Sequence, residues 1–586
     1  MTDFRVWAPV ARHVTAEIDG RPVDMTAAPD GWWDVSVPEA RPDARYGFRL
    51  DGGDLLSDPR SRRQPDGPAG LSQLYDHTGS RCGAVAWSDS GWRGRPLPGS
   101  VLYELHIGTF TPAGTFDAAI ERLDHLVALG IDVVELMPVA SFPGLRGWGY
   151  DGISLWAVHE PYGGPDGLQR FVDACHARGL AVLLDVVYNH VGIGNRLAEF
   201  GPYFTDAQLT PWGPAVNLDQ PGSAEVRAFI IDNALMWLRD YHLDGLRLDA
   251  VHALADSSDV HLLEQLAVEV ADLAKHRGRE VVLIAESDAN DPRLAAPREQ
   301  GGYGLTGQWN DDFHHALHAA LTGERQGYYS DFGSLAVLAK TLTHVFRHDG
   351  GWSTFRGAPH GHPVEVHGTP AYRFVGYLQN HDQIGNRAAG DRLSASLTDG
   401  LLRVGAGLAL TAPFTPMLFM GEEWGASTPW QFFADHPDPG FGRAVAEGRR
   451  AEFARHGWTG EVPDPQAEAT FARSTLNWAE LDTEPHRSLL AWYRELIALR
   501  RTLPELRDPR LDHVSVSFNE EQRWLVVNRG GVPDRDIRVA ANLSPRGRRL
   551  TTGIARGRLV AASAPGIRIE DSTVWLPPTS LAVIVG

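Results

Sequence analysis

The sequence has very little cysteine and no long apolar run. Among its 586 residues there are two cysteines, Cys82 and Cys175. Two cysteines so far apart in so long a chain are typical of free thiols in a reducing compartment, not of a disulfide framework. No apolar stretch approaches the roughly 20 residues that span a bilayer, and the polar N-terminal segment is unlike a secretory leader. We therefore expect a cytoplasmic protein with no membrane partner.

Lysine is scarce too, and positive charge is in deficit. Only Lys275 and Lys340 are present, and 54 Lys and Arg stand against 74 Asp and Glu, for a formal net charge of −20. Nucleic acids and anionic membranes bind basic surfaces, so neither is expected as a partner. Tryptophan, by contrast, is abundant, with 18 residues. Because aromatic faces stack on the apolar faces of sugars, this composition favours a carbohydrate ligand, although any single Trp can equally serve the core.

The hydrophobic pattern divides the chain into three regions. Short alternating runs such as 4–20, separated by Gly, Pro and Asp, predict a small β-sandwich near the N-terminus, and similar runs at 523–531 and 572–586 predict a second one at the other end. A chain of 586 residues agrees with about three domains. The predicted domains are an immunoglobulin-like N-terminal β-sandwich at 1–90, a catalytic domain at 91–504 and a C-terminal antiparallel β domain at 505–586.

The middle region alternates strand-like apolar runs with amphipathic helices. Examples are the helix at 116–130, which ends on Gly130, and the helix at 223–242, with Ser223 as its predicted cap. Such alternation implies parallel strands joined by right-handed crossovers, and eight units predict an α/β fold of the (β/α)8 or TIM-barrel type. The eight strand candidates are 101–110, 131–139, 180–190, 246–251, 280–287, 306–310, 373–382 and 415–424.

A doubly wound open sheet is the competing fold. The sequence has no G-x-G-x-x-G after its first strand and no G-x-x-x-x-G-K-[ST], which argues against a nucleotide-binding version of that fold.

Carboxylates recur at the predicted C-terminal ends of the strands, where a barrel of this kind carries its active site. Asp185 ends the third strand, Asp249 the fourth and Glu286 the fifth, and Asp382 follows the seventh. One such carboxylate can be a helix cap or a surface charge, but carboxylates at several strand ends predict a catalytic site. Arg247 shares a face of the fourth strand with Asp249, because side chains in a strand repeat with period two.

Two chemistries use clustered carboxylates and histidines, namely metal-assisted hydrolysis and glycoside cleavage. The best local metal pattern is His314 with His318 at i, i+4, and it lacks the Glu of H-E-x-x-H. These histidines are typical of ordinary polar helix residues. We therefore expect no metal and no other cofactor.

Glycoside cleavage requires one ionised carboxylate to attack the sugar and one protonated carboxyl group to donate to the leaving oxygen. Arg247 beside Asp249 would favour the ionised form of Asp249. Glu286, facing Asp249 and Asp382, would have its proton affinity raised by like charge. Asp382 is suited to steady positive charge on the ring. We expect His190 and His381 to form hydrogen bonds with sugar hydroxyls, and Tyr150 to stack on the face of a sugar ring.

Four short motifs resemble the signature regions of the α-amylase superfamily of glycoside hydrolases, in the same order and on the expected strands. They are DVVYNH (185–190), GLRLDAVH (245–252), AES (285–287) and QNHDQ (379–383). The resemblance covers roughly residues 100–500 and implies a retaining mechanism through a covalent glycosyl-enzyme. It implies Asp249 as nucleophile, Glu286 as general acid/base and Asp382 as transition-state stabiliser. The implied substrate-binding residues are Tyr150, Asp185, His190, Arg247, His252, Gln379, His381 and Gln383.

Two further stretches, 307–332 and 421–436, resemble the maltooligosyltrehalose trehalohydrolases of that superfamily. Those enzymes of trehalose biosynthesis hydrolyse the α-1,4 bond next to a terminal trehalose and release trehalose. The resemblance implies maltooligosyltrehalose, an α-glucan oligosaccharide, as the substrate. Recognition of an α,α-1,1-linked disaccharide calls for extra polar groups, and the resemblance assigns Asn310, Asp311, Asp312 and His314 to this part of the site.

Two alternatives remain open from the sequence. A glycogen branching enzyme shares the domains and the carboxylates but transfers the glucan chain to another glucan. A barrel without enzyme activity usually lacks one of the three carboxylates, and this chain keeps all three. The insert between His190 and Ser223 is short, which argues against the structural calcium that many α-amylases hold near the position of Asn189.

Overall fold

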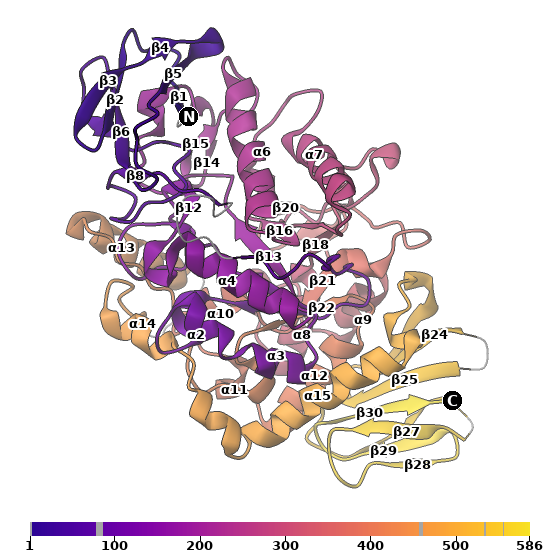
Figure 1. The fold of residues 1–586 in the computed structure, drawn as a ribbon. Coiled ribbons are helices and arrows are strands. Elements are labelled where there is room, and N and C mark those ends of the chain that lie inside the picture. Colours follow the sequence, from indigo (N-terminus) through magenta and orange to yellow (C-terminus); the bar gives the residue numbers. More distant parts are fainter. Residues whose placement is uncertain (1–2, 78–85, 456–460, 533–534, 555) are drawn as a thin grey trace.

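Three structural regions follow one another along the chain (Figure 1). The computed structural model describes residues 3–77, 86–455, 461–532, 535–554 and 556–586. Cys82 lies outside these residues, and Cys175 is a buried free thiol. Within the described part of the chain, no helix is both long and apolar enough to cross a membrane.

The N-terminal region consists of two antiparallel sheets. One has the order β1 (Asp3–Trp7), β5 (Trp32–Ser36), β4 (Thr26–Ala27). The other has the order β3 (Arg21–Asp24), β2 (Val14–Ile18), β6 (Arg45–Leu50), β7 (Leu55–Leu56), with β8 (Ser72–Gln73) also on β6. Alternate residues of β2 are buried, as the period of two predicts for a half-buried strand.

Eight parallel strands close into a barrel at the centre of the molecule. All eight overlap the predicted segments, although the fourth strand ends at Leu248, one residue before Asp249, and β22 pairs with β9 to close the ring. The prediction of a (β/α)8 barrel is therefore confirmed. The strands, in order around the barrel, are β9 (Leu102–Leu105), β10 (Val133–Leu136), β13 (Ala181–Val186), β16 (Gly245–Leu248), β17 (Val282–Ala285), β18 (Gly307–Trp309), β21 (Phe374–Tyr377) and β22 (Thr415–Phe419).

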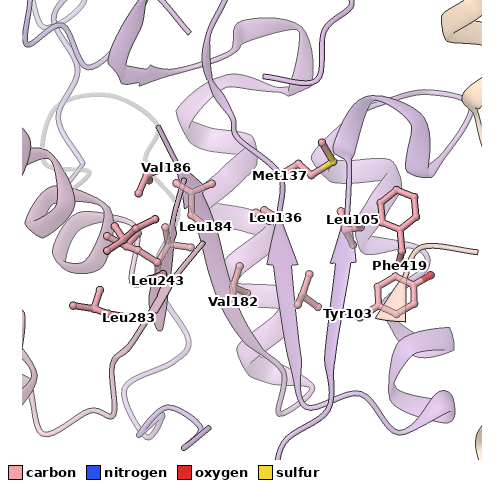
Figure 2. Close-up of a cluster of buried hydrophobic side chains, with 14 of the residues drawn as sticks. Tyr103, Leu105, Leu136, Met137, Val182, Leu184, Val186, Leu243, Leu283 and Phe419 are labelled. Atoms are coloured by element: carbon pink, nitrogen blue, oxygen red, sulfur yellow. The ribbon is translucent and has the colours of Figure 1, made fainter. Parts of the chain in front are cut away.

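Both faces of the barrel strands are buried. Tyr103 and Leu105 of β9 belong to the large core between the strands and the surrounding helices, part of which Figure 2 shows. Leu102, on the other face of β9, belongs to the core inside the barrel, together with Ile284 and Trp309. Because side chains alternate along a strand, Glu104 lies on the same inner face as Leu102. Glu104 is thus an acid among apolar neighbours.

Helices cover the outside of the barrel. They are α2 (Phe116–Ile120), α3 (Leu123–Leu129), α4 (Gly164–Ala177), α6 (Ser223–Asp240), α7 (Leu262–Arg277), α8 (Asp311–Thr322), α9 (Leu335–His344), α12 (Asp399–Thr411) and α15 (His486–Thr502). Further helices lie in the connections: α1 (Ile107–Phe110), α5 (Leu197–Phe200), α10 (His381–Gly385), α11 (Leu393–Ser396), α13 (Pro439–Arg455) and α14 (Glu468–Ser474).

Two helix details differ from the prediction. The segment 116–130 forms two helices, α2 and α3, although Gly130 ends the second one in the left-handed region, as predicted, with φ of 99°. Ser223 does not cap α6, because it is already the first helical residue; Gly222 occupies the cap position, and no side-chain hydrogen bond is made there.

Three short hairpins lie in the loops of the barrel. They are β11 (Ala140–Ser141) with β12 (Ser154–Val158), β14 (Phe204–Thr210) with β15 (Gly213–Val216), and β19 (Trp352–Ser353) with β20 (Ala358–Pro359).

The C-terminal region has a five-stranded and a three-stranded antiparallel sheet. The first has the order β23 (Val514–Asn519), β24 (Trp524–Val532), β25 (Arg535–Asn542), β30 (Ser580–Val585), β27 (Arg558–Ala562). The second has the order β26 (Arg548–Thr551), β29 (Thr573–Leu576), β28 (Arg568–Glu570). The β domains at both ends agree with the predicted fold class, and the domain boundaries near residues 90 and 505 stay predictions.

Candidate active site

A buried arginine holds two carboxylates together at the C-terminal end of β16. Arg247 is 0% exposed, and its Nη1 donates to Asp185 Oδ2 at 2.7 Å and to Asp249 Oδ1 at 2.8 Å. Its guanidinium carbon lies 4.1 Å from the centroid of a Trp309 ring, which adds a cation–π contact. Two negative charges on one enclosed cation are compatible with burial because the charges are paired and hydrogen-bonded.

Asp249 itself is held at both carboxylate oxygens. The Nδ2 of Asn189 donates to Asp249 Oδ2 at 2.7 Å, opposite the bond from Arg247. The next residue, Ala250, has φ of 41°, a left-handed conformation that is unusual for a residue other than glycine. This turn directs the backbone N–H of Ala250 to Glu286 Oε2 at 2.6 Å, so local strain couples the two carboxyl groups.

Glu286 directly follows β17 and is the protonated member of the group. Burial raises its pKa well above the ordinary value, and the nearby charges of Asp249 and Asp382 raise the pKa further, against the opposing effect of Arg247. Arg247 Nη2 lies 3.6 Å from Glu286 Oε2. Asp249, which accepts a hydrogen bond from Arg247 at 2.8 Å, and Glu286 therefore flank one guanidinium.

Asp382 lies in the first turn of α10, which Asn380 caps by accepting from the backbone N–H of Gln383 at 2.8 Å. Desolvation raises the pKa of Asp382, but the charge of His381 and hydrogen bonds from His381 and Asn386 outweigh it and lower the pKa to about 2. Asp382 is therefore ionised at neutral pH. Its side chain is 38% exposed, which leaves it open to a ligand.

Glu104 fixes His381 from the first barrel strand, a role that sequence reasoning missed. Its Oε2 accepts from the backbone N–H of His381 at 2.9 Å, and its Oε1 lies 2.5 Å from His381 Nδ1. Burial alone would lower the pKa of His381, but the charges of Asp382 and Glu104 raise it well above the ordinary value. His381 is therefore an imidazolium between two carboxylates.

Tyr150 connects Asp185, which is bonded to Arg247, with His381. Its hydroxyl donates to Asp185 Oδ2 at 2.6 Å and lies 2.8 Å from His381 Nε2. Its ring is nearly parallel to that of His381, with centroids 5.2 Å apart. Burial raises the pKa of Asp185 to about 6, although Arg247 opposes this effect. Asp249, Glu286, Asp382, Arg247, Asp185, Tyr150 and His381 thus form one connected group, as the sequence predicts.

A second missed acid, Glu135, lies beside Glu104. The two residues are partners in the β9–β10 register, and both are buried. Neither carboxyl oxygen of Glu135 has a hydrogen-bond partner among the described residues. Burial raises the pKa of Glu135 well above its ordinary value, and the charge of Glu104 adds to the effect, so Glu135 is neutral. The repeated pair Glu-Leu, at 104–105 and 135–136, was the available sequence signal.

Four more predicted residues surround this group. His190 Nε2 lies 3.0 Å from the carbonyl oxygen of Tyr150, and the His190 ring stacks on Trp212. Gln383 Nε2 donates to Asp311 Oδ1 at 3.1 Å. Burial raises the pKa of Asp311 to about 6. His252, the fourth, is exposed, and its Nδ1 lies 3.8 Å from Asp288 Oδ1.

The other four predicted residues make structural contacts. Asn310 caps α8 by accepting from the backbone N–H of Phe313. Asp312 Oδ2 accepts from the backbone N–H groups of residues 347 and 348, at 2.7 and 2.9 Å. His314 Nδ1 lies 2.8 Å from a backbone carbonyl oxygen, that of residue 378. Gln379 Oε1 accepts from the backbone N–H of residue 393. Their assignment to the substrate site stays a prediction.

Asp288 is a third residue that the sequence did not single out. It lies two positions after Glu286, and its Oδ2 pairs with Arg356 at 2.5 Å, which places charged groups beside Glu286. Among the residues that the structure describes, no group of three or more His, Cys, Asp and Glu side chains is arranged to hold a metal ion.

Comparison with known proteins agrees with this geometry. The model of the α-amylase catalytic domain matches residues 46–200. The chain is 53% identical over 587 aligned residues to a malto-oligosyltrehalose trehalohydrolase of Mycobacterium tuberculosis (strain CDC 1551 / Oshkosh), with 100% of this chain and 99% of the relative covered. The chain belongs to the malto-oligosyltrehalose trehalohydrolase family. This family is the one that the stretches 307–332 and 421–436 resemble.

Two other relatives place the trehalohydrolase family among its neighbours. A 1,4-alpha-glucan branching enzyme of Geobacillus stearothermophilus is 28% identical, over 73% of this chain and 68% of that protein. A crystal structure described as a putative alpha amylase from Salmonella typhimurium is 39% identical, with a TM-score of 0.90, and covers 100% of this chain and 97% of that one. The flanking β regions are therefore shared with a solved structure as well as the barrel.

Proposed function

We propose that this chain hydrolyses the α-1,4-glucosidic bond next to the terminal trehalose of maltooligosyltrehalose. The products are trehalose and a maltooligosaccharide. The support comes from the full-length identity of 53% to a trehalohydrolase and from two carboxyl groups beside Arg247: Asp249 accepts a hydrogen bond from it, and Glu286 has a pKa well above the ordinary value. That second observation carries the chemistry, because glycoside cleavage needs one charged and one protonated carboxyl group at the same bond.

Asp249 is the nucleophile in this proposal. It is held by Arg247 and Asn189 at its two oxygens, which fixes the orientation of the carboxylate. Its attack on the anomeric carbon forms a glycosyl-enzyme ester and breaks the bond to the leaving oxygen. Glu286, kept protonated by burial and like charge, donates its proton to that oxygen, which leaves as a hydroxyl group of trehalose.

Glu286 then acts as a base in the second half of the reaction. It takes a proton from water, the hydroxide oxygen attacks the anomeric carbon, and Asp249 leaves as a carboxylate, which gives net retention. Asp382, ionised at neutral pH, stabilises positive charge on the ring in both transition states. The sugar ring lies against the side chains of Tyr150 and His381.

Trehalose occupies the side of the site that carries Glu286, because the acid must reach the leaving oxygen. Asp288 and His252 lie on this side, after β17 and β16, and Asp311 lies nearby, close enough for its charge to act on Glu286. These groups supply the polar contacts for the hydroxyls of the disaccharide.

The test compares two substrates. The protein is incubated separately with maltotriosyl trehalose and with maltopentaose, and the products are separated. Rapid release of trehalose from the first and slow attack on the second is the expected outcome. Equal attack on both substrates, or branched products from amylose, would contradict the proposal and favour a plain glucan hydrolase or a branching enzyme.

A further inference from the structure

A separate cavity of about 650 Å³ opens between the N-terminal region and the barrel loops. Its volume lies within the range of roughly 300–1,000 Å³ that is typical of small-molecule sites. Its walls combine residues 65–69 of the N-terminal region with loop residues that follow β10, β13 and β22. None of the three catalytic carboxylates lines it. Its apolar lining includes Pro68, Phe142, Leu145, Ile153, Ile193 and Phe441.

The position of the cavity follows from the strand order. Glu286 follows β17, which lies four strands away from β9 in the closed barrel, whereas β10 and β22 are the two neighbours of β9. The cavity therefore lies across the barrel mouth from the general acid. Since the leaving group occupies the side of the acid, the glucan chain on the other side of the cleaved bond extends toward the cavity.

The wall of the cavity also adjoins the residues around the cleaved bond. Asp151 directly follows Tyr150, and its Oδ2 lies 3.6 Å from Nε2 of His436 in the cavity wall. Ile193, in the same wall, comes three residues after His190, whose ring is bound to the carbonyl oxygen of Tyr150. The two sites share their dividing wall.

Exposed apolar side chains and an unpartnered polar atom indicate that the cavity receives a ligand. Leu145 and Ile193 are 64% and 63% exposed at its edge, and they line the same cavity as Phe142 and Phe441, so the exposed apolar surface is grouped in one place. Phe142 stacks on His159, with ring centroids 3.7 Å apart. His159 is 2% exposed, and its Nε2 has no partner among the described residues. Asp66 and Asp438 add acceptors for hydroxyl groups.

We propose that this cavity binds the distal, non-reducing part of the glucan chain, so that residues 65–69 of the N-terminal region belong to the substrate site. The apolar faces of the glucose units lie on Phe142, Leu145 and Ile193. Their hydroxyls meet His159 and the two acids. This inference rests on the proposed function, because it concerns the same substrate.

The test measures kcat/KM for trehalose release from maltosyl trehalose and from maltopentaosyl trehalose. The variants are Leu145→Asp, Ile193→Asp and Ala69→Asp, whose side chains are exposed, so the fold is retained. The expected result is a loss of about tenfold on the long substrate, mainly through KM, as for the loss of one buried aliphatic contact. The value for the short substrate stays within twofold of wild type.

Val10→Asp is the matched control, because Val10 is 74% exposed in the same N-terminal region and lies outside the cavity. It leaves both substrates unaffected. The inference would be overturned if the wild-type protein cleaves both substrates and the variants lower kcat/KM equally on both, or on neither. The proposed function would then still stand. A wild-type protein that releases no trehalose from either substrate would refute the proposed function itself.

Discussion

Replacement of Arg247 by methionine removes the cation that Asp185 and Asp249 share and keeps a similar volume. Arg247 is completely enclosed and bonded to both Asp185 and Asp249. Asp185 is left with the hydroxyl of Tyr150 and Asp249 with the amide of Asn189. Removing one partner of a buried ion pair costs about 3–5 kcal/mol, because an uncompensated charge stays inside the protein. We expect a destabilisation of this size at pH 8.

The cost decreases at lower pH. The pKa of Asp185 is already raised to about 6 by burial, against the effect of Arg247, and loss of the cation raises it further. A carboxyl group with a raised pKa binds its proton more tightly in the folded than in the unfolded chain. Its contribution to stability is full below the unfolded pKa and is lost as the pH rises through the folded pKa. The difference between variant and wild type is therefore smaller at pH 5 than at pH 8.

Urea unfolding, followed by tryptophan fluorescence at both pH values, measures this difference in stability. Trehalose release measures activity. We expect the activity of Arg247→Met to fall by at least 1,000-fold, which corresponds to about 4 kcal/mol in the activation barrier. Arg5→Met is the control, because Arg5 also lies over a Trp ring, that of Trp32, but at the exposed N-terminal sheet; it changes stability by less than about 0.5 kcal/mol. A penalty for Arg247→Met that is the same at both pH values, or activity within tenfold of wild type, would refute the reasoning.

Three further predictions concern acidic residues around Asp249. Glu104→Gln removes a charge that holds His381 protonated, so the pKa of His381 falls and the alkaline limb of the kcat profile moves to lower pH; an unchanged profile would show that Glu104 only fills space. Glu286→Gln abolishes trehalose release but retains activity on α-maltosyl fluoride, whose leaving group needs no acid, and equal loss on both substrates would exclude Glu286 as the acid. Asp311→Asn removes a charge that raises the pKa of Glu286, so the alkaline limb of the kcat/KM profile moves to lower pH, and a shift to higher pH would contradict the electrostatic coupling.

The barrel strands could be predicted from the sequence because each is a short apolar run buried on both faces. The strand ends then placed Asp185, Asp249 and Glu286 at one edge without any knowledge of packing. The predictions that were wrong concern the exact residue at which a helix begins. Ser223 has the chemistry of a helix cap, yet the helix begins one residue earlier than a serine cap would require.

Glu104 and Glu135 show what the strand pattern hides. Each is a single acid within an apolar strand, so its side chain could have faced either side of the sheet. The closed barrel places both on the inner face, in register with each other, and Glu104 reaches His381, which lies 277 positions away in the sequence. The strand pattern alone does not predict such a contact, because it depends on closure of the barrel, which leaves only β22 between the seventh strand, β21, and the first, β9.

Azide rescue tests the central claim, which is that Asp249 is the nucleophile and Glu286 the acid/base. Each residue is replaced by alanine, and each variant is incubated with α-maltosyl fluoride and sodium azide. We predict β-maltosyl azide from Asp249→Ala, because azide enters the space left by the nucleophile. We predict α-maltosyl azide from Glu286→Ala, because azide attacks the glycosyl-enzyme from the opposite face. The reverse pair of products, or the same anomer from both variants, would contradict the account.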